Sequence, residues 1–276
     1  MLQDIEPYVL DNQYCPRPPQ DNDYIFIYHN NQVIFGGEVQ ELQLPKYCDV
    51  LMIWQVKLEQ LVYLFSVDDI AFYLMLHKVP ETNGYSYHII QAFRDIQPKW
   101  MSFAVATATH LGAWYDCNRY CGKCAGKMEQ KSDERALFCP KCSLRKYPQI
   151  SPVIIVGIID GERILLTKYA SGYDRYALVA GFVEIGETLE DAVRREIKEE
   201  VGLNVCNIRY YKSQPWAFSQ SLLMGFFADV YGDDNVTIDK RELSEATWFH
   251  REDIPKGYTT ISLTWTMIEA FRNKNI

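Results

Sequence analysis

The sequence has little that would take the chain into a membrane or out of the cell. Its start, MLQDIEPYVLD, is acidic and lacks the basic segment and apolar segment of a secretory signal. The richest apolar stretch, residues 61–76, is interrupted by Asp68 and Asp69 and is shorter than the roughly 20 apolar residues of a membrane helix. We therefore expect a cytoplasmic protein with no membrane partner.

Positive charge is also scarce. The chain of 276 residues has 28 lysines and arginines against 36 aspartates and glutamates, a net charge of −8. This balance disfavours broad electrostatic binding of nucleic acid, although a local site could still recognise a nucleotide or an RNA end. The five histidines are scattered, and the N-terminal half carries no evident catalytic group.

Cysteines are few, but four of the eight have a regular spacing. Cys121 and Cys124 form one pair and Cys139 and Cys142 form another, with 14 residues between the pairs. This spacing is typical of a zinc ribbon with four thiolate ligands, and in a reducing compartment metal binding is favoured over disulfides. We predict one structural Zn²⁺ per chain, with a redox or catalytic role for the thiols as the alternative. The remaining cysteines are expected to be isolated thiols: Cys15, Cys48, Cys117 and Cys206.

The order of apolar runs predicts an α+β chain with three parts: an N-terminal α+β domain (1–112), a zinc ribbon (113–146) and a C-terminal domain (147–276). The N-terminal domain should contain two hairpins, one of residues 24–28 with 32–35 and one of residues 61–67 with 70–76. A largely helical segment is expected at residues 87–115, and within it Pro98 fits the start of a helix. The C-terminal domain should contain six strands and a final helix, at residues 152–159, 163–167, 176–181, 208–211, 222–230, 246–249 and 261–272. A mixed sheet covered by helices, an α/β/α sandwich, fits this order.

An acidic helix follows the third of these strands. Thr188 can cap its start and Gly202 can end it. At about 100° per residue, Glu196, Glu199 and Glu200 share the face that carries the apolar residues. Packing of this helix therefore draws three like charges towards the protein body, where divalent cations that prefer oxygen ligands would compensate them. The alternative is an ordinary acidic helix on the surface.

The same segment resembles the Nudix box, G-x5-E-x7-R-E-U-x-E-E-x-G-U with U an aliphatic residue. Every fixed position from Gly181 to Leu203 is matched. The resemblance implies a Nudix α/β/α sandwich and hydrolysis of a nucleoside diphosphate linked to another group. It also implies that Glu196, Glu199 and Glu200 hold Mg²⁺ or Mn²⁺. Families of this kind can carry a diverged Nudix-like fold at the N-terminus.

Two further features are similar to the NADH pyrophosphatase branch of these hydrolases. One is the zinc ribbon before the box. The other is the segment SQPWAFSQS after it, which resembles SQPWPFPxS but has Ala217 and Ser219 in place of two prolines. Proline lowers the entropy cost of ordering a loop, so these replacements imply a looser or reshaped loop. The resemblance implies substrate contacts from Gln214, Pro215, Trp216, Ala217, Phe218, Ser219, Gln220 and Ser221, with core packing of Trp216 and Phe218 as the alternative.

In that branch, water splits NAD(H) into nicotinamide mononucleotide and AMP, and some members remove NAD caps from RNA 5′ ends. Local matches imply that Tyr147 and Phe182 form a nicotinamide pocket, in which an aromatic ring can stack on a flat heteroaromatic one. Glu134 and Ala180 match further substrate positions. Glu242 matches a late metal-binding carboxylate.

Other assignments also follow from the match. Glu245 is the nearest rival of Glu242 for the metals. Arg195 is expected to orient Glu187 or another carboxylate, and Glu199 or Glu200 to accept the proton of the attacking water. Relatives of this kind imply a homodimer.

Three alternative functions stay open. A Nudix hydrolase could act on ADP-ribose or dinucleoside polyphosphates, or the domain could be a non-catalytic ligand sensor, although the intact box argues against a sensor. A zinc-ribbon protein that binds nucleic acid is disfavoured by the net acidity. Its only support is a scatter of basic residues: Lys123, Lys127, Lys131, Lys141, Arg145 and Lys146.

Overall fold

The computed structural model describes residues 1–37, 43–82, 84–93, 96–172, 174–256 and 261–276. They form an N-terminal unit of residues 2–149 with 217–220, and a C-terminal unit of Met1 with residues 150–216 and 221–276. The division into three domains at residues 112 and 146 stays a prediction. Within the described ranges, no helix is both long and apolar enough to cross a membrane.

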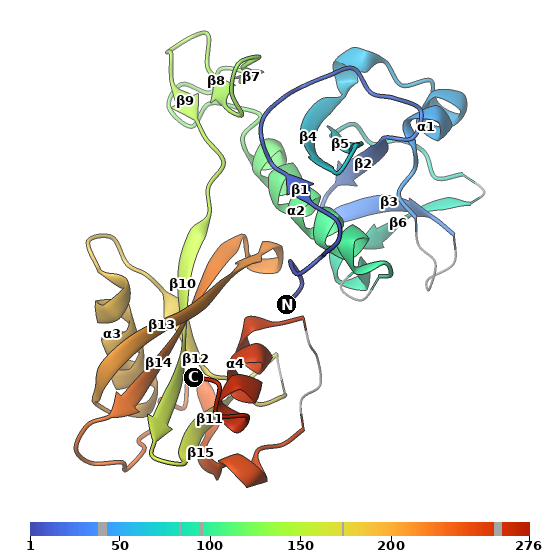
Figure 1. The fold of residues 1–276 in the computed structure, drawn as a ribbon. Coiled ribbons are helices and arrows are strands. Elements are labelled where there is room, and N and C mark those ends of the chain that lie inside the picture. The colour runs from blue at the N-terminus through green and yellow to red at the C-terminus, as the bar shows by residue number, and fades with distance from the viewer. Residues whose placement is uncertain (38–42, 83, 94–95, 173, 257–260) are drawn as a thin grey trace. The chain divides into compact units, whose positions relative to one another are not determined.

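The described N-terminal residues form a mixed six-stranded sheet in the order β1-β4-β5-β2-β3-β6 (Figure 1). Both predicted hairpins are confirmed, because β2 pairs antiparallel with β3 and β4 pairs antiparallel with β5. A parallel pairing of β2 with β5 joins the two hairpins. The bounds are β1 (Leu10–Asp11), β2 (Tyr24–His29), β3 (Gln32–Gly36), β4 (Val62–Val67), β5 (Ile70–Met75) and β6 (Tyr85–Ile89), with short 3-10 turns at Leu58–Gln60 and Ile90–Phe93.

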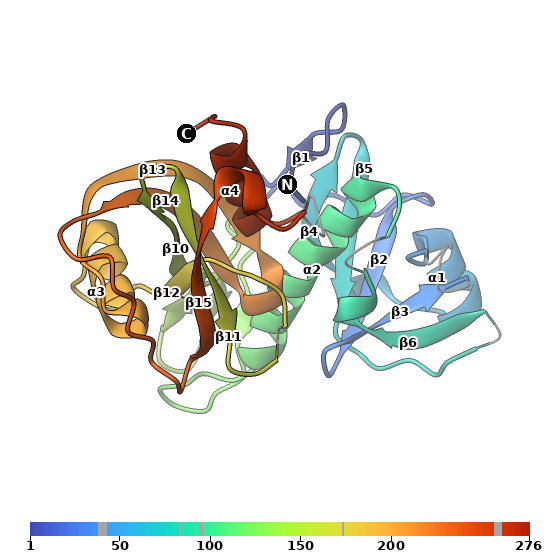
Figure 2. The ribbon, with the colours of Figure 1, turned by 90° about the horizontal axis from the view of Figure 1, so that it is seen from below.

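A helix covers each face of this sheet (Figure 2). Successive residues of a strand point to opposite faces, so neighbouring residues of β2 enter different cores. Phe26 packs in the cluster that includes α2 (Lys99–Cys117), and Ile27 packs in the cluster that includes α1 (Tyr47–Trp54). The sequence did not predict α1.

The prediction of a helical segment at residues 87–115 is wrong for its first part. Residues Tyr85–Ile89 form β6, which pairs with β3. Aromatic and branched side chains at every second position favour a strand here over a helix. The helix α2 begins at Lys99, directly after Pro98, as expected for a proline at a helix start.

The zinc ribbon belongs to the N-terminal unit and contains a small three-stranded sheet (Figure 1). Its strands are β7 (Glu129–Gln130), β8 (Leu137–Phe138) and β9 (Arg145–Lys146). Met128 and Leu137 are buried in the same cluster as Trp114 and Tyr115 of α2. The ribbon is therefore joined to the end of α2 by a shared core.

The described C-terminal residues form a second mixed sheet, in which β13, β14, β10, β11 and β15 are neighbours in that order and β12 also pairs with β10. The pairing of β10 with β14 is parallel and the others are antiparallel. All six predicted strands are present, as β10 (Ser151–Asp160), β11 (Arg163–Tyr169), β12 (Val179–Phe182), β13 (Val205–Trp216), β14 (Ser221–Val230) and β15 (Leu243–His250).

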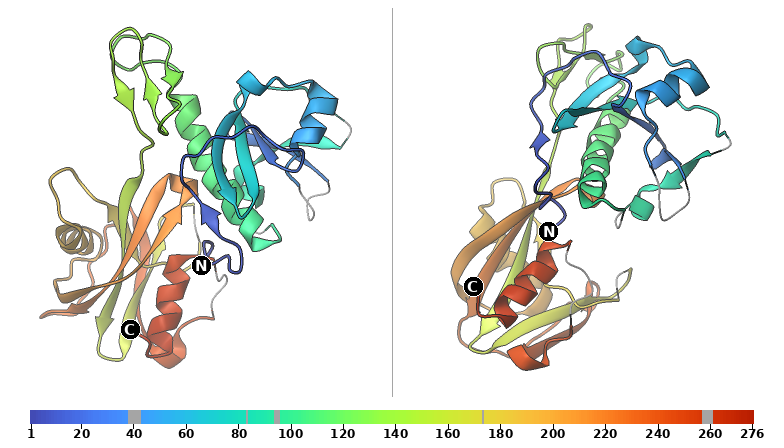
Figure 3. Two further views of the ribbon diagram at one scale, coloured as in Figure 1. Left: turned by 45° about the horizontal axis from the view of Figure 1, so that its top comes forward. Right: turned by 45° about the vertical axis from the view of Figure 1, so that its right-hand side comes forward.

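Helices α3 (Leu189–Val201) and α4 (Leu263–Arg272) lie on opposite faces of this sheet (Figure 3). Ile154 of β10 is buried on the side of α3, and the next residue, Ile155, is buried on the side of α4. A short 3-10 turn of this part lies at Arg251–Asp253, whereas the turn at Ala217–Ser219 belongs to the N-terminal unit. The predicted α/β/α arrangement of the C-terminal part is thus present.

Both sheets share one connectivity. In each, the first strand of an antiparallel hairpin, β2 or β10, pairs parallel with a later strand, β5 or β14. A helix, α1 or α3, lies between these elements in the sequence. A diverged copy of the Nudix fold in the N-terminal unit would have this connectivity.

Candidate active site and zinc ribbon

The four cysteines of the ribbon come together in space. The sulfur atoms of Cys121, Cys124, Cys139 and Cys142 lie within 4.8 Å of one another, and the Cys121–Cys142 and Cys124–Cys139 separations are 3.5 Å. A tetrahedral zinc ion with bonds of about 2.3 Å places its sulfur ligands about 3.8 Å apart, whereas a disulfide bond is about 2.0 Å long. The four thiols therefore fit structural zinc and not two disulfides.

The substitution Cys139→Ser is expected to abolish zinc binding and unfold the ribbon. Cys139 is fully buried in the core cluster of the N-terminal unit. In small zinc domains, metal binding contributes on the order of 10 kcal/mol to folding. Metal analysis and thermal unfolding would measure both losses, with Cys117→Ser as the control because Cys117 is exposed and lies outside the cluster. Equal zinc contents in the two variants would contradict the assignment.

The acidic helix α3 begins and ends as the sequence predicts. Thr188 Oγ1 accepts a hydrogen bond from the Asp191 backbone N–H at 3.1 Å, and Gly202 ends the helix with a left-handed φ of 75°. Ala192 and Val193 are buried in the cluster on one face of the C-terminal sheet. Glutamates on the same side of the helix are thereby turned towards the sheet.

Two of the three helix glutamates are buried. Glu196 is 9% exposed and Glu200 is 2% exposed, whereas the side chain of Glu199 is 60% exposed. Burial raises the pKa of Glu200 to about 8, and the charges of Glu196 and Glu242 add to this rise. Burial also raises the pKa of Glu196, although Arg195 opposes the rise. The site therefore gathers negative charge where water is largely excluded.

One oxygen of Glu200 lacks a donor that would compensate its charge. This Oε2 atom is buried and has no hydrogen-bond partner. A buried carboxylate oxygen without a donor is costly, and a divalent cation that prefers oxygen ligands would compensate it. The residues thus fit such a cation in chemistry and charge. In the described part of the chain, their oxygens are not gathered as closely as the ribbon sulfurs.

The backbone at Gly181 makes room for the carboxylate of Glu196. Gly181 lies in β12, and a Cβ atom at this position would be 1.9 Å from Cδ of Glu196 and 2.0 Å from its Oε1. No side chain fits in this space. Gly181 therefore leaves the space that the carboxylate of Glu196 occupies. The spacing of the motif does not reveal this role.

Arg195 holds several carboxylates at once. Its guanidinium donates to the two oxygens of Glu187 at 2.7 and 2.9 Å, which is the contact expected from the sequence. It also donates to Glu196 at 2.7 Å, to Glu199 at 3.0 Å and to the carbonyl of Phe182 at 3.0 Å. The hydrogen bonds from Arg195 lower the pKa of Glu187 to about 2. Arg195 therefore ties the loop before α3 to the helix itself.

Glu242 and Glu245, the two candidate metal ligands after β14, have different surroundings. Glu245 accepts hydrogen bonds from Lys168 Nζ and Tyr176 Oη, both at 2.7 Å, and the bond from Lys168 lowers its pKa. Glu242 is exposed, and its charge acts on both buried glutamates of α3. Glu242 is thus the better placed of the two. Sequence reasoning missed Lys168 and Tyr176 because they lie 77 and 69 residues from Glu245 and belong to no motif.

The first part of the SQPWAFSQS segment is structural. Gln214 is fully buried, its Nε2 donates to the carbonyl of Ile261 at 2.7 Å, and its Oε1 accepts from the N–H of Leu263 at 2.7 Å. It therefore anchors the start of α4. Trp216 packs against the core that contains α4, as the alternative of core packing expects.

The rest of the segment belongs to the N-terminal unit. Ala217 and Phe218 line a cavity of about 150 Å³ with Thr109 and Ala113 of α2. Along the segment, Pro215, Ser219 and Gln220 are exposed and Ser221 is buried. Direct contact of these residues with a substrate stays a prediction.

The remaining predicted contact residues form two pairs. In the N-terminal unit, Tyr147 Oη donates to Glu134 Oε2 at 3.2 Å. In the C-terminal unit, Ala180 and Phe182 lie in β12, and Phe182 is 54% exposed. A pocket that joins the two pairs stays a prediction.

Comparison with known families agrees with this geometry. Residues 149–267 match the NUDIX domain, and residues 117–147 match the NADH pyrophosphatase zinc ribbon domain. The chain therefore contains a match to the NUDIX domain at residues 149–267, which is less than half of its length. Its mixed fold and its four-cysteine ribbon are therefore as predicted, and the NUDIX domain implies a divalent cation in addition to zinc.

Similar proteins include NAD-capped RNA hydrolases called NudC. The chain is 45% identical over 148 residues to NudC of Klebsiella pneumoniae subsp. pneumoniae and equally to NudC of Escherichia coli strain K12 / DH10B. Each match covers 52% of this chain and 56% of the relative. The matched part thus spans about half the length of these curated relatives.

A solved structure also resembles part of this chain. It is a NUDIX hydrolase from Nitrosomonas europaea, with a TM-score of 0.48 and 23% sequence identity. The match covers 57% of this chain and 92% of that one.

Proposed function

We propose that this protein hydrolyses the pyrophosphate bond of NAD(H) and releases nicotinamide mononucleotide and AMP. The observation that carries the proposal is the pair of buried glutamates, Glu196 and Glu200, with an unpartnered oxygen on Glu200. Such a site suits a metal-dependent reaction at a negatively charged diphosphate. The similar NudC proteins, named as NAD-capped RNA hydrolases, support NAD-capped RNA as a further substrate.

The chain's own residues would divide the work as follows. Glu196, Glu200 and Glu242 would hold Mg²⁺ or Mn²⁺, with Glu199 as a further ligand. When bound, the ion would neutralise charge on the phosphoryl oxygens and lower the pKa of a water molecule. Arg195 keeps Glu187 and Glu196 in place through its hydrogen bonds. Glu199 or Glu200 would accept the proton of the attacking water.

The base of the substrate would stack on Phe182. This residue is 54% exposed although its side chain is large and apolar, and it follows the glycine that faces Glu196. The substitution Phe182→Ala is expected to raise KM for NADH by roughly tenfold, since stacking of one base contributes about 1–3 kcal/mol. Steady-state kinetics would measure this change. Ile185→Ala, three residues after Phe182 and fully exposed, is the control and should leave KM unchanged.

Product analysis tests the reaction itself. Purified protein with one equivalent of zinc would be incubated with Mg²⁺ or Mn²⁺ and, separately, with NADH, NAD⁺, ADP-ribose and NAD-capped RNA. Chromatography should reveal nicotinamide mononucleotide and AMP from the dinucleotides. Fast release of AMP and ribose phosphate from ADP-ribose alone would favour the alternative substrate. Intact dinucleotide after long incubation, together with tight binding, would favour a sensor.

We also propose a cytoplasmic homodimer, on the resemblance to the NADH pyrophosphatase branch. Light scattering coupled to gel filtration would determine the number of chains in solution. A monomer at micromolar concentration would contradict this assembly without affecting the proposed reaction.

A further inference from the structure

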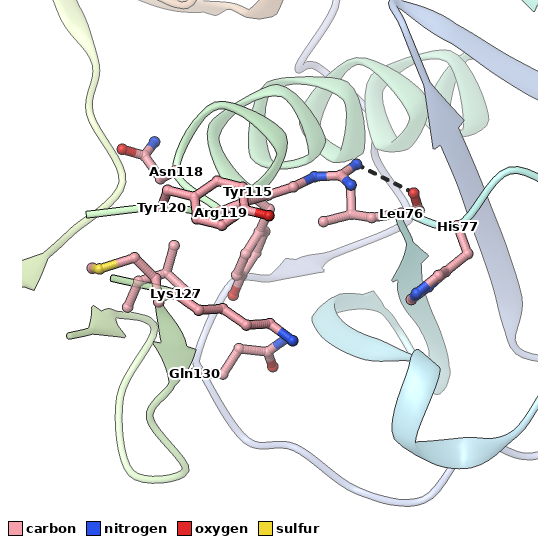
Figure 4. A pocket seen from close by; sticks show the side chains of 10 residues that line it. Leu76, His77, Tyr115, Asn118, Arg119, Tyr120, Lys127 and Gln130 are labelled. Carbon is pink, nitrogen blue, oxygen red and sulfur yellow. Dashed lines mark hydrogen bonds between the residues drawn. The ribbon is translucent and has the colours of Figure 1, made fainter. Parts of the chain in front are cut away.

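A cavity of about 360 Å³ lies within the N-terminal unit, where the zinc ribbon meets the end of α2 (Figure 4). Its volume falls within the usual range of small-molecule sites. The acidic helix α3 and its glutamates belong to the other unit. None of the residues that line this cavity has a role in the proposed hydrolysis, so its chemistry requires a separate explanation.

The charge of the cavity is opposite to that of the chain. Arg119 and Lys127 contribute two permanent positive charges, and His77 lies beside them. In Figure 4 the side chains of Arg119 and Lys127 extend in the direction of His77. The described lining residues include no acid, although the whole chain carries a net charge of −8. Such a local excess of positive charge favours an anionic ligand.

The two cations are not equivalent. Arg119 donates to the carbonyl of Leu76 at 3.3 Å and forms an ion pair with Asp116, so its position is fixed and part of its charge is compensated. Lys127 is exposed and has no ion pair among the described residues. Lys127 is therefore the stronger attraction for an anion, and Arg119 would add a positioned donor.

An aromatic face lies next to this charge. Tyr120 is 68% exposed, which is a large exposure for a tyrosine, and Met128 and Leu137 add apolar surface to the cavity. Exposed aromatic rings beside cationic side chains are the usual means of binding a nucleobase together with its phosphate. The combination is more specific than a basic patch, because both parts of the ligand have a partner.

The first zinc knuckle holds these residues in place. Tyr120 and Lys127 are paired across it by a backbone bridge, and the N–H of Met128 donates to the carbonyl of Arg119 at 3.0 Å. Inside this hairpin, the N–H of Cys121 donates to the carbonyl of Gly126 at 2.8 Å. The side chains of Tyr120 and Lys127 are thus attached to neighbouring backbone positions that are held in place, which lowers the entropy cost of binding.

We propose that this cavity binds a nucleoside monophosphate unit, with the base on Tyr120 and the phosphate between Lys127 and Arg119. The unit could be a free mononucleotide or one nucleotide of an RNA strand, since both present the same base and phosphate. The site requires neither the glutamates of α3 nor a pyrophosphate bond. This proposal can therefore be tested independently of the proposed hydrolysis.

Equilibrium binding to the full-length, zinc-loaded protein tests this site. The probes are AMP and a short single-stranded RNA with a 5′ monophosphate, neither of which contains a pyrophosphate bond. Buffers free of Mg²⁺ and Mn²⁺, without a chelator that would remove zinc, keep phosphate away from the glutamates. The variants are Tyr120→Ala and Lys127→Gln, both at exposed positions. The matched control is Lys123→Gln, an exposed lysine of the same knuckle that does not line the cavity.

We expect Tyr120→Ala and Lys127→Gln each to weaken binding by about tenfold, and Lys123→Gln to change it by less than about twofold. Binding of AMP would identify a mononucleotide site, and binding of the RNA alone would identify a site for a strand. Equal binding by all four proteins would overturn the proposal. Loss of binding in Phe182→Ala but not in Tyr120→Ala would also overturn it, because the ligand would then bind the C-terminal unit.

Discussion

The substitution Glu200→Gln is expected to lower NADH turnover by at least about 1000-fold, because a metal-binding carboxylate supplies several kcal/mol of transition-state stabilisation. Glutamine keeps the size of the side chain but cannot hold a cation as a carboxylate does. Steady-state kinetics with saturating Mg²⁺ or Mn²⁺ would measure the loss. Glu190→Gln, at an exposed position of the same helix, is the matched control and should keep normal turnover.

The same substitution should make the protein more stable when Mg²⁺ and Mn²⁺ are absent. The pKa of Glu200 is about 8 in the folded protein, well above the value of about 4.3 in an unfolded chain. The folded state therefore binds more protons between these pH values, and the wild type loses stability as the pH rises through this range. The neutral amide has no such dependence.

Thermal unfolding at pH 7.5, with zinc retained, would measure this gain. The midpoint of the Glu200→Gln variant should exceed that of the wild type by a few degrees, roughly 2–6 °C. A variant that hydrolyses NADH at the normal rate would remove Glu200 from the metal site. A variant that is inactive because it is unfolded would contradict the argument from buried charge.

The substitution Gly181→Ala should also remove most activity, although alanine has no chemistry of its own. Its Cβ atom would lie 1.9 Å from Cδ of Glu196, so the carboxylate must move. A displacement of about 1 Å in a catalytic site can cost about 100-fold in rate. The backbone of Gly181 has no positive φ, so alanine causes no backbone strain, and we expect a folded protein.

Two controls separate displacement of Glu196 from general damage. Gly122→Ala places a Cβ atom in open space and should leave activity unchanged. In a Glu196→Gln background, Gly181→Ala should have little further effect, because both changes act on the same carboxylate. If the activity loss of the double variant equalled the product of the two single losses, Gly181 would act in some other way.

Much of the fold could be predicted because local patterns and the final structure agree. The apolar runs around Asn30 and Asn31 predict a hairpin, and both asparagines adopt the positive φ that such a turn needs. Helix α3 has its cap at Thr188 and its end at Gly202, as expected. By contrast, the helix expected from residue 87 overlooks the alternation that makes β6 a strand. Helix α1 is not predicted because its eight residues carry too little periodicity.

The candidate site was predictable only where one segment of sequence contains it. The glutamates of α3 lie on one helix, so a helical wheel places them on its buried face. The partners of Glu245 lie in β11 and between β11 and β12, far from Glu245 in the sequence, and no local pattern indicates them. For the same reason, the role of Gln214 as an anchor for α4 could not be deduced, since its bonds reach residues 47 and 49 positions away.

The parallel pairing of β10 with β14 sets an order of events during synthesis on the ribosome. Residues 161–220, which contain α3, are synthesised and emerge before β14 does. The apolar face of α3 packs on Phe226 and Ala228 of that strand. At about 5–20 residues per second, the nascent chain must hold this helix without its partner for a few seconds. Chains that stop short of residue 221 should therefore be bound by chaperones, because the strand that completes the sheet is missing.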